Sequence, residues 1–322
     1  MRAIDRVGVC VLIVVGWLAV PVARGDLLYV SEYSSDSIWR VDSSGTATLF
    51  VSGTSGLDGP AAIAFGAGGD LYVANSLLGS VSRITPTGTV SVFVSGTAGI
   101  VAPAGIAFDA AGDLYVADNF SNSVVRVTPG GVVSTFVSST SGLTAPTGLA
   151  FDAAGNLYVA NSTANTIAKV TSGGTVTAFA SAGLNQPYGL AFDAAGNLYA
   201  ANYVGNTITK FNPSGSPSLF AGGFNNPVGL AFDAAGTLYA ANSGSGLIDR
   251  ITASGSMSTF TDMGNFDPFG GPFGLAFAPI PEPATFAAAV CGVLMLLAVG
   301  WRRSQARRAP APVSRATRDA RA

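Results

Sequence analysis

Six oxygen-bearing side chains recur at nearly constant spacing and are the first candidates for chemistry in this chain. They are Glu32, Asn75, Asp118, Asn161, Asn202 and Asn242. Carboxylate and amide oxygens are ligands for Ca²⁺ or Mg²⁺, so Glu32, Asn75, Asp118 and Asn161 form a candidate metal site. The alternative is that each side chain caps the turn that follows it. Six near-equivalent copies favour this structural role, because a catalytic site normally breaks the symmetry of a repeat array.

A second set of recurring residues is basic, with one cation in every repeat. These residues are Arg40, Arg83, Arg126, Lys169, Lys210 and Arg250, and they are all the Lys and Arg side chains between residues 26 and 280. We expect each stem to pack along a neighbouring repeat, with its charged head paired or solvated. An anion-binding role is the alternative interpretation.

Three loops that differ from one another carry the most informative residues. Their sequences are "GLNQPYG", "GFNNPVG" and "MGNFDPFGGPFG", and they supply Asn185, Tyr188, Phe224, Asn226, Phe266, Asp267, Phe269 and Phe273. Aromatic rings beside amide and carboxylate groups can stack on sugars and hydrogen-bond to them. Ordinary loop packing with turn-forming Asn and Pro is the alternative. The loops indicate a ligand face for a polysaccharide or another surface protein.

The composition excludes several classes of site. The chain contains no histidine, which removes Ser-His-Asp and Cys-His nucleophile systems and every His-ligated metal site. Its two cysteines, Cys10 and Cys291, lie in terminal apolar segments. Residues 26 to 280 carry six Lys or Arg against fifteen Asp or Glu, and such an acidic body argues against binding nucleic acid.

The candidate residues sit in a repeat that predicts the fold. "FDAAGNLYVAN" at residues 151–161 recurs with small changes, and the phenylalanine that ends each "GLAF"-like run is Phe65, Phe108, Phe151, Phe192, Phe232 or Phe277. The steps between these phenylalanines are 43, 43, 41, 40 and 45 residues. Each unit contains four short apolar segments separated by turn residues. Four strands in a unit of this length are typical of one blade of a β-propeller.

The two ends of the repeat region complement each other. The region begins with "LLYVSEY", the second strand of a blade, and ends with "GPFGLAFAP", a first strand with nothing after it. We therefore predict an all-β, six-bladed β-propeller with four antiparallel strands per blade, in which the N- and C-terminal strands share one blade. In the turn of each full repeat, we expect Asp to bond the backbone and Gly to take a positive φ.

The repeat P-x-G-[LI]-A-F-D-A-A-G-[ND]-L-Y-V-A-[ND] resembles the NHL repeat between about Asp26 and Ala278. This resemblance implies a six-bladed propeller and, for function, a non-enzymatic binding or scaffold module. The fold also resembles gluconolactonase-like propellers, which hold a divalent metal with Glu, Asn and Asp side chains at the channel. This resemblance implies the alternative function, a metal-dependent lactonase or hydrolase. The innermost strands here carry no such side chain before their terminal turn, so the resemblance transfers no catalytic residue. Peptide-amidating and streptogramin-type lyases on related propellers use histidine, which is missing.

The N-terminal segment resembles a secretory signal. Arg2 and Arg6 precede the apolar run Val7–Val20, and small residues Ala23 and Gly25 would allow cleavage before Asp26. We expect residues 1–25 to be a signal peptide, a retained membrane anchor being the alternative.

The C-terminal segment, residues 281–322, resembles the bacterial PEP-CTERM sorting signal. An uncharged stretch, Ala284–Trp301, is long enough for a transmembrane helix, and the arginines that follow should hold the tail in the cytoplasm. The motif residues are Pro281, Glu282, Pro283, Arg302 and Arg303. The resemblance implies an exosortase-type processing enzyme as partner, membrane attachment before processing, and a destination at the cell surface or in an extracellular matrix. A plain membrane anchor is the alternative.

Overall fold

The computed structural model of the protein describes residues 27–264 and 271–279. The chain divides into two compact units, Met1–Pro279 and Ile280–Ala322. The predicted signal peptide (residues 1–25) and sorting segment (residues 281–322) lie outside the described residues. Within the described part, no helix is long and apolar enough to cross a membrane.

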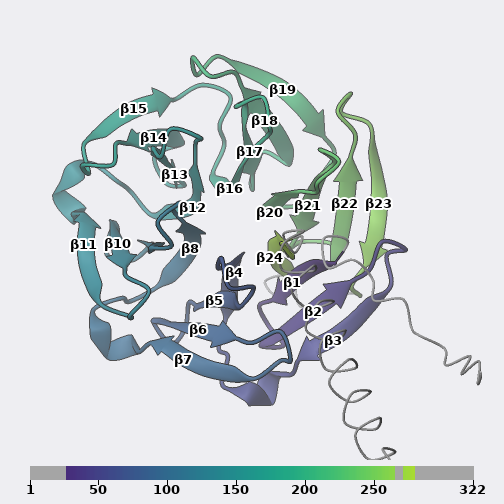
Figure 1. Ribbon diagram of the computed structural model, residues 1–322. Coiled ribbons are helices and arrows are strands. Elements are labelled where there is room, and N and C mark those ends of the chain that lie inside the picture. The colour runs from purple at the N-terminus through teal and green to yellow at the C-terminus, as the bar shows by residue number, and fades with distance from the viewer. Residues whose placement is uncertain (1–26, 265–270, 280–322) are drawn as a thin grey trace, which may run out of the picture. The chain divides into compact units, whose positions relative to one another are not determined.

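The described residues of the first unit form six four-stranded antiparallel sheets arranged in a ring (Figure 1). Blade 1 is β24-β1-β2-β3, and blades 2 to 6 follow in chain order from β4 to β23. The innermost strands are β24 (Pro272–Phe277), β4 (Pro60–Phe65), β8 (Pro103–Phe108), β12 (Pro146–Phe151), β16 (Pro187–Phe192) and β20 (Pro227–Phe232). The second strands are β1 (Leu28–Glu32), β5 (Leu71–Asn75), β9 (Leu114–Asp118), β13 (Leu157–Asn161), β17 (Leu198–Asn202) and β21 (Leu238–Asn242).

The outer half of each blade is built from two further strands. The third strands are β2 (Ser37–Val41), β6 (Ser80–Ile84), β10 (Ser123–Val127), β14 (Thr166–Val170), β18 (Thr207–Phe211) and β22 (Leu247–Ile251). The fourth strands are β3 (Ala47–Val51), β7 (Val90–Val94), β11 (Val133–Val137), β15 (Val176–Ala180), β19 (Pro217–Gly222) and β23 (Met257–Asp262). Three 3₁₀ turns lead out of β3, β7 and β11: η2 (Gly53–Ser55), η3 (Gly96–Ala98) and η4 (Ser139–Ser141). The predicted all-β, six-bladed fold is confirmed.

The phenylalanine and tyrosine of the repeat hold neighbouring blades together. Tyr115 of blade 3 meets Phe136 of its own fourth strand and Phe151 of blade 4 edge-on, at centroid distances of 4.8 and 5.0 Å. The same pair of contacts recurs at the other blade interfaces. Edge-to-face pairs of this kind stabilise by about 0.5–1.5 kcal/mol beyond the area they bury.

The ring is closed by the two ends of the repeat region, as predicted. Leu28 of β1 pairs with Phe277 of β24, and Val30 pairs with Leu275. The amide of Ala278 also donates to the carbonyl of Leu27 at 3.1 Å. Blade 1 is therefore a single sheet assembled from both ends of the repeat region.

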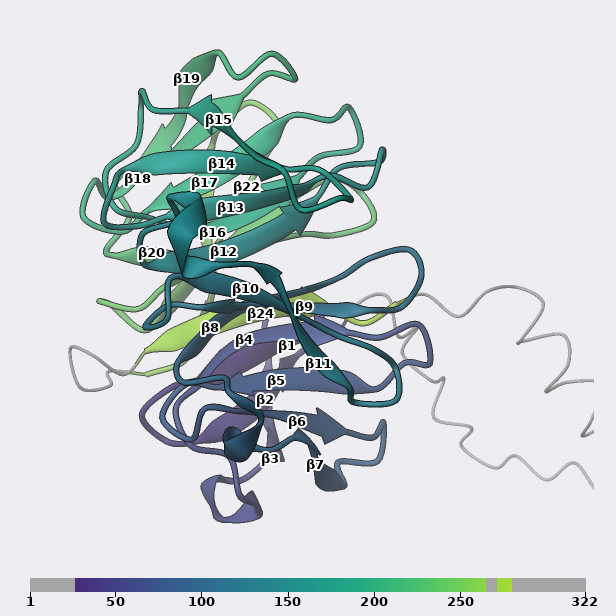
Figure 2. The same cartoon turned by 90° about the vertical axis from the view of Figure 1, so that its left-hand side faces the viewer.

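Because the strands are antiparallel, the propeller has two distinct faces (Figures 1 and 2). The turns between second and third strands and the connections between blades lie on one side, called here the mouth face. The turns between first and second strands and between third and fourth strands lie on the other, the turn face. The entry at Leu28 and the exit at Phe277 both lie on the turn face, because they occupy the ends that a first-to-second-strand turn joins in the other blades.

The glycine of Pro-x-Gly is explained by the crowding of innermost strands around the axis. A Cβ on Gly148 would lie 2.1 Å from the carbonyl oxygen of Tyr188 in the next blade, and Gly189 and Gly229 face the next innermost strand in the same way. Blade 2 departs from this pattern, since it carries Ala62 at the equivalent position.

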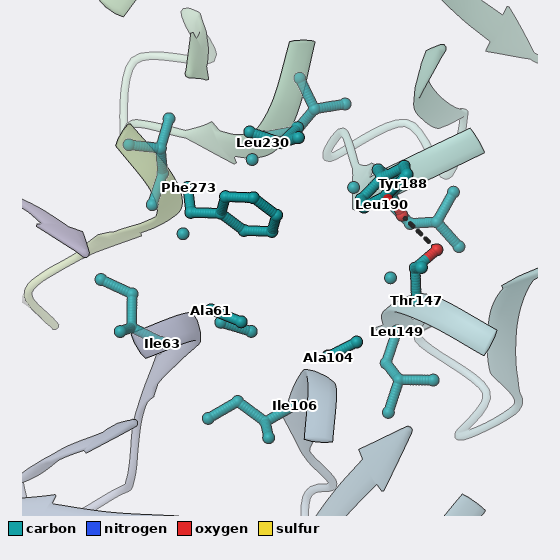
Figure 3. A pocket seen from close by; sticks show the side chains of 18 residues that line it. Ala61, Ile63, Ala104, Ile106, Thr147, Leu149, Tyr188, Leu190, Leu230 and Phe273 are labelled. Carbon is teal, nitrogen blue, oxygen red and sulfur yellow. Dashed lines mark hydrogen bonds between the residues drawn. The ribbon is translucent and has the colours of Figure 1, made fainter. Parts of the chain in front are cut away.

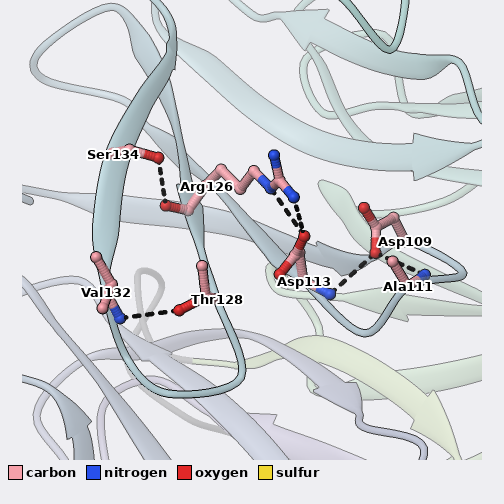
Figure 4. A network of polar contacts seen from close by, with 7 residues as sticks. All are labelled: Asp109, Ala111, Asp113, Arg126, Thr128, Val132 and Ser134. Atoms are coloured by element: carbon pink, nitrogen blue, oxygen red, sulfur yellow. Dashed lines mark hydrogen bonds and ion pairs between the residues drawn. The ribbon is translucent and has the colours of Figure 1, made fainter.

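Among the described residues, four of the six cations form ion pairs on the turn face, within their own blades. The Asp109 side chain accepts hydrogen bonds from the amides of Ala111 and Asp113 (Figure 4). Gly112 has φ 87°, as predicted for this turn. Arg126 forms an ion pair with Asp113 of the same blade (Figure 4). Arg83 forms the equivalent ion pair with Asp70. Lys169 and Lys210 pair instead with Asp152 and Asp193, which are the first residues of their turns and correspond to Asp109. The expected pairing of the charged head is confirmed for these four cations. Their contacts lie within their own blade and not along a neighbouring one, because the register places each of the four directly across from its own blade's tyrosine, beside its own turn.

Candidate ligand-binding mouth

A pocket of about 320 Å³ opens on the mouth face at the ring axis. Its walls come from the second residue of the innermost strands, from the residue that follows the second strands, and from Ala102, which precedes β8. The lining includes Tyr33, Ala61, Ser76, Ala102, Ala104, Asn119, Thr147, Tyr188, Tyr203, Ser243 and Phe273. All these side chains are uncharged at neutral pH, so the pocket offers rings, hydroxyls and one amide.

Four aromatic rings lie in contact along one side of this pocket. Tyr33 and Phe273 of blade 1 lie 5.5 Å apart between centroids, with their planes 35° from parallel. Tyr188 and Tyr203 of blade 5 lie 5.0 Å apart at the same tilt. Tyr188 also meets Phe273 at 6.2 Å, which joins the two pairs. We call these four residues the aromatic wall.

The opposite side of the pocket is made of small and polar residues. Here the positions equivalent to Tyr188 and Phe273 are Ala61, Ala104 and Thr147. The Asn119 amide donates to the Pro146 carbonyl at 3.3 Å, which fixes its orientation. The hydroxyl of Thr147 donates to the carbonyl of Pro187 at 3.0 Å. The mouth therefore combines flat apolar surface on one side with hydrogen-bonding groups on the other.

Beneath the mouth, a narrower cavity of about 200 Å³ continues along the axis. Three residues of each innermost strand line it, and Phe273 points into it, as Figure 3 shows. Its side chains are Ala, Ile, Leu and Val apart from Thr147, Tyr188 and Phe273. Tyr188 is thus the one titratable side chain that this cavity contains among the described residues.

The electrostatics of the mouth favour neutral groups. Burial raises the pKa of Tyr188, and the neighbouring Tyr203 and Tyr33 raise it further. Its phenol therefore stays protonated throughout the physiological range and remains a hydrogen-bond donor. No Lys or Arg of the described part lines the pocket.

Two of the predicted ligand-face residues, Tyr188 and Phe273, form part of the aromatic wall. Asn226 stands behind it, because its side-chain amide donates to the Tyr203 carbonyl at 3.0 Å. Asn185 is exposed in the connection before β16, where its backbone amide donates to Asn202. Phe266, Asp267 and Phe269 lie outside the described residues.

Phe224 does not belong to the ligand face, and this prediction is corrected. Its side chain is 6 % exposed and packs in the core with Ile208 and Leu230. The reason is its position in the connection: in each described connection between blades, the residue three positions before the proline is apolar and packs into the core. Leu57, Ile100, Leu143 and Leu184 take this place in the other connections.

The residues of the predicted metal site hold the loops of their own blades. Glu32 accepts a hydrogen bond from the amide of Ser35 at 2.7 Å. The carboxylate of Asp118 accepts from the amides of Val101 and Ala102, at 2.9 and 3.1 Å. Within the described ranges, no group of three or more His, Cys, Asp or Glu is placed to hold a metal ion.

The remaining two members of the predicted metal site are amides with structural contacts. Asn161 accepts from the amide of Thr144 at 3.2 Å, and Asn75 donates to the hydroxyls of Ser80 and Ser82. The Asn75 oxygen has no hydrogen-bond partner among the described residues. The metal site itself stays a prediction, but three of its four residues already use their oxygens on backbone amides.

Sequence reasoning missed half of the aromatic wall. Tyr33 and Tyr203 directly follow the recurring Glu32 and Asn202, and their equivalents in the other blades are Ser76, Asn119, Ser162 and Ser243. This position varies strongly while the residue before it barely changes. A variable residue directly after the recurring Glu, Asn or Asp was the signal in the sequence that could have located the mouth.

The fold and the mouth define a six-bladed propeller with a pocket lined by aromatic rings at one end of its axis. The chain belongs to the virginiamycin B lyase family, whose model matches residues 16–222. No curated protein matches the chain.

Solved structures share the fold at low sequence identity. A chain from the crystal structure of a nidogen/laminin complex is 19 % identical, with a TM-score of 0.69 over 79 % of this chain and 98 % of that one. Virginiamycin B lyase from Staphylococcus aureus is 17 % identical, with a TM-score of 0.58 over 74 % of this chain and 81 % of that one. A catalytically inactive histidine-to-alanine variant of virginiamycin B lyase from Staphylococcus aureus, with quinupristin, is also 17 % identical, with a TM-score of 0.57 over 74 % and 85 %.

Proposed function

We propose that this protein is a non-enzymatic binding propeller that holds an uncharged polysaccharide at its mouth. The observation that carries the proposal is the aromatic wall facing the polar side of the same pocket. Flat rings cover the apolar face of a sugar, and hydroxyl and amide groups satisfy its polar edge.

The charge of the pocket supports a neutral ligand. Its lining contains no carboxylate and no cation among the described residues. A charged sugar would lose hydration on entry and gain no ion pair in return. Neutral hexose units in a polysaccharide fit this requirement.

Binding without catalysis is supported by the composition of the chain. The lyase relative named above is inactive as a histidine-to-alanine variant, and this chain contains no histidine. The alternative, a metal-dependent lactonase using Glu32 and Asp118, is less well supported because backbone amides already occupy their oxygens. We therefore assign the mouth to recognition.

The proposed location is the cell surface or an extracellular matrix. The signal-like residues 1–25 and the PEP-CTERM-like motif Pro281-Glu282-Pro283 support export and recognition by an exosortase-type enzyme. Replacing the three motif residues with Ala should leave the protein in the inner membrane, as cell fractionation would reveal. Release at the unchanged rate would contradict this part of the proposal.

Binding of neutral oligosaccharides to the purified full chain, by glycan array and then calorimetry, tests the function. Tyr188→Ala should weaken binding by about tenfold or more, equivalent to about 1.4 kcal/mol, whereas Tyr188→Phe should retain the stacking. Val92→Ala, an exposed change on the outer strand β7, is the matched control. Equal binding by all three variants, or turnover of a lactone without glycan binding, would overturn the proposal.

A further inference from the structure

Large apolar side chains are exposed together on the mouth face of blades 2 and 3. Leu77 is 64 % exposed, Leu78 48 %, Val101 50 % and Phe120 75 %. All four lie in turns or connections and not in strands. We call these four residues the apolar ridge.

The segments that carry the ridge are in contact across the two blades. The turn of blade 2 touches the connection to blade 3, because a Cβ on Gly79 would lie 2.6 Å from the Ile100 carbonyl oxygen and 3.0 Å from that of Val101. The side chain of Asp118 accepts from the amides of both Val101 and Ser121. These contacts bring the connection that carries Val101 next to the turns that carry Leu78 and Phe120.

The ridge also reaches the edge of the mouth without being part of it. A Cβ on Gly59 would lie 2.7 Å from the Leu77 side chain and 3.2 Å from the ring of Tyr33. Leu77 thus lies beside the aromatic wall, while no ridge residue lines the mouth pocket. The equivalent turns of blades 1, 4 and 6 carry "SS", "TA" and "GS" in place of the two leucines.

The charges on the mouth face are acidic throughout the described part. The six cations stand near the turn-face end of the third strands, and four of them form ion pairs there. Asp36 and Asp58 flank Leu77, since the Asp36 side chain accepts from the Gly59 amide and the Leu77 amide donates to the Asp58 carbonyl. A partner that buries the ridge would place cations opposite these carboxylates.

We propose that the apolar ridge is a docking surface for a partner protein segment that combines Lys or Arg with large apolar side chains. Exposed apolar groups supply the buried area, and Asp36 and Asp58 select a basic partner. The negative face disfavours an anionic membrane. This inference concerns residues outside the pocket and goes beyond the proposed polysaccharide binding.

A fluorescein-labelled peptide of alternating Arg and Leu is the probe, with the matched Glu and Leu peptide as its control. The full chain should bind the basic peptide and not the acidic one. The double variant Leu77→Ser/Phe120→Ser should weaken binding by about tenfold or more, and Asp58→Asn by about threefold. Val92→Ser/Leu219→Ser removes two side chains of similar exposure, 69 and 72 %, from outer strands and should bind normally.

Three results would overturn the inference. One is equal loss of peptide binding in both double variants. Another is ridge-dependent co-sedimentation with phosphatidylcholine–phosphatidylglycerol vesicles, which would make the surface a membrane contact. The third is a dimer in sedimentation velocity that the ridge variant abolishes, which would make a second copy the occupant. Oligosaccharide binding should persist in the ridge variant, so failure of this inference is separable from failure of the proposed function.

Discussion

The backbone amide of Gly274 donates a hydrogen bond to the hydroxyl of Ser31 at 2.8 Å, across 243 residues of sequence. The same hydroxyl donates to the carbonyl of Ala61 in blade 2 at 2.8 Å. Alanine occupies the position of Ser31 in every other blade. One side chain that departs from the repeat therefore links the last innermost strand to the next blade at the point of closure.

Replacing Ser31 with Ala should destabilise the protein by about 1–3 kcal/mol, because two buried backbone groups lose their partner. Chemical denaturation measures the change. Ser82→Ala, which removes a buried hydroxyl within blade 2, is a control that leaves the closure intact. Identical stability of Ser31→Ala and the parent protein would show that the closure does not depend on this contact.

Gly148→Ala should cost about 1–3 kcal/mol through overpacking. The new Cβ would meet the Tyr188 carbonyl at 2.1 Å, so the innermost strands must separate and the aromatic wall must shift. Thermal unfolding and oligosaccharide affinity should both fall. Ala62→Gly, the reciprocal change in blade 2, should leave affinity unchanged, and a comparable loss there would argue against strand crowding as the cause.

The ion-paired aspartates of blades 4 and 5 predict acid sensitivity. Burial raises the pKa of Asp152, but hydrogen bonds from Asn156 and the charge of Lys169 outweigh it, so the pKa lies below the ordinary 3.8. Asp193 behaves in the same way, with hydrogen bonds from Asn197 and Tyr199 and the charge of Lys210 outweighing burial. A depressed carboxyl pKa contributes stability above its unfolded value, and that stability is lost as pH falls through the folded pKa.

Unfolding free energy should therefore decline below about pH 4. Asp152→Asn/Asp193→Asn should be less stable than the parent at pH 7 and should lose less on acidification. Denaturation series at several pH values compare the two proteins. An equally steep decline in the variant would mean that other groups control the acid transition.

Removal of divalent metal should leave the protein unchanged. The oxygens of Glu32, Asp118 and Asn161 accept hydrogen bonds from backbone amides, so a metal ion would have to displace these contacts. Melting temperatures with EDTA, Ca²⁺ or Mg²⁺ should agree. A rise in melting temperature with Ca²⁺ that Glu32→Gln abolishes would instead establish the predicted metal site.

Oligosaccharide affinity should be nearly constant between pH 6 and about pH 9. The pocket contains no carboxylate or cation among its described residues, and burial raises the pKa of Tyr188. Calorimetry across this range measures the dependence. A steep change near neutrality would require a titrating group that the described lining does not contain.

The sequence predicted the fold well because its periodicity is redundant. The residues of each Phe–Tyr contact and each Asp-to-turn contact recur in the next repeat. A wrong strand assignment in one repeat is therefore corrected by comparison with the others. The ring closure could also be predicted from the sequence. Leu28 and Phe277 belong to incomplete repeats, and each of these repeats supplies the strands that the other lacks.

The site was only partly readable because side-chain direction depends on tertiary packing. Phe224 and Phe273 both lie near a Pro-x-Gly motif, but one stands three residues before the proline and turns into the core, and the other directly follows it and faces the axis. Tyr33 and Tyr203 come from turns distant in sequence from the loops with obvious aromatic content. The closed ring brings these tyrosines together with Tyr188 and Phe273, and the sequence pattern alone does not predict that proximity.

The entry and exit of the ring, Leu27 and Ala278, are hydrogen-bonded neighbours at the turn face. A tether joined to either position would thus attach to the turn face and leave the mouth face pointing away from the attachment point. The position of the ring closure therefore determines which face of a tethered propeller points away from the attachment point.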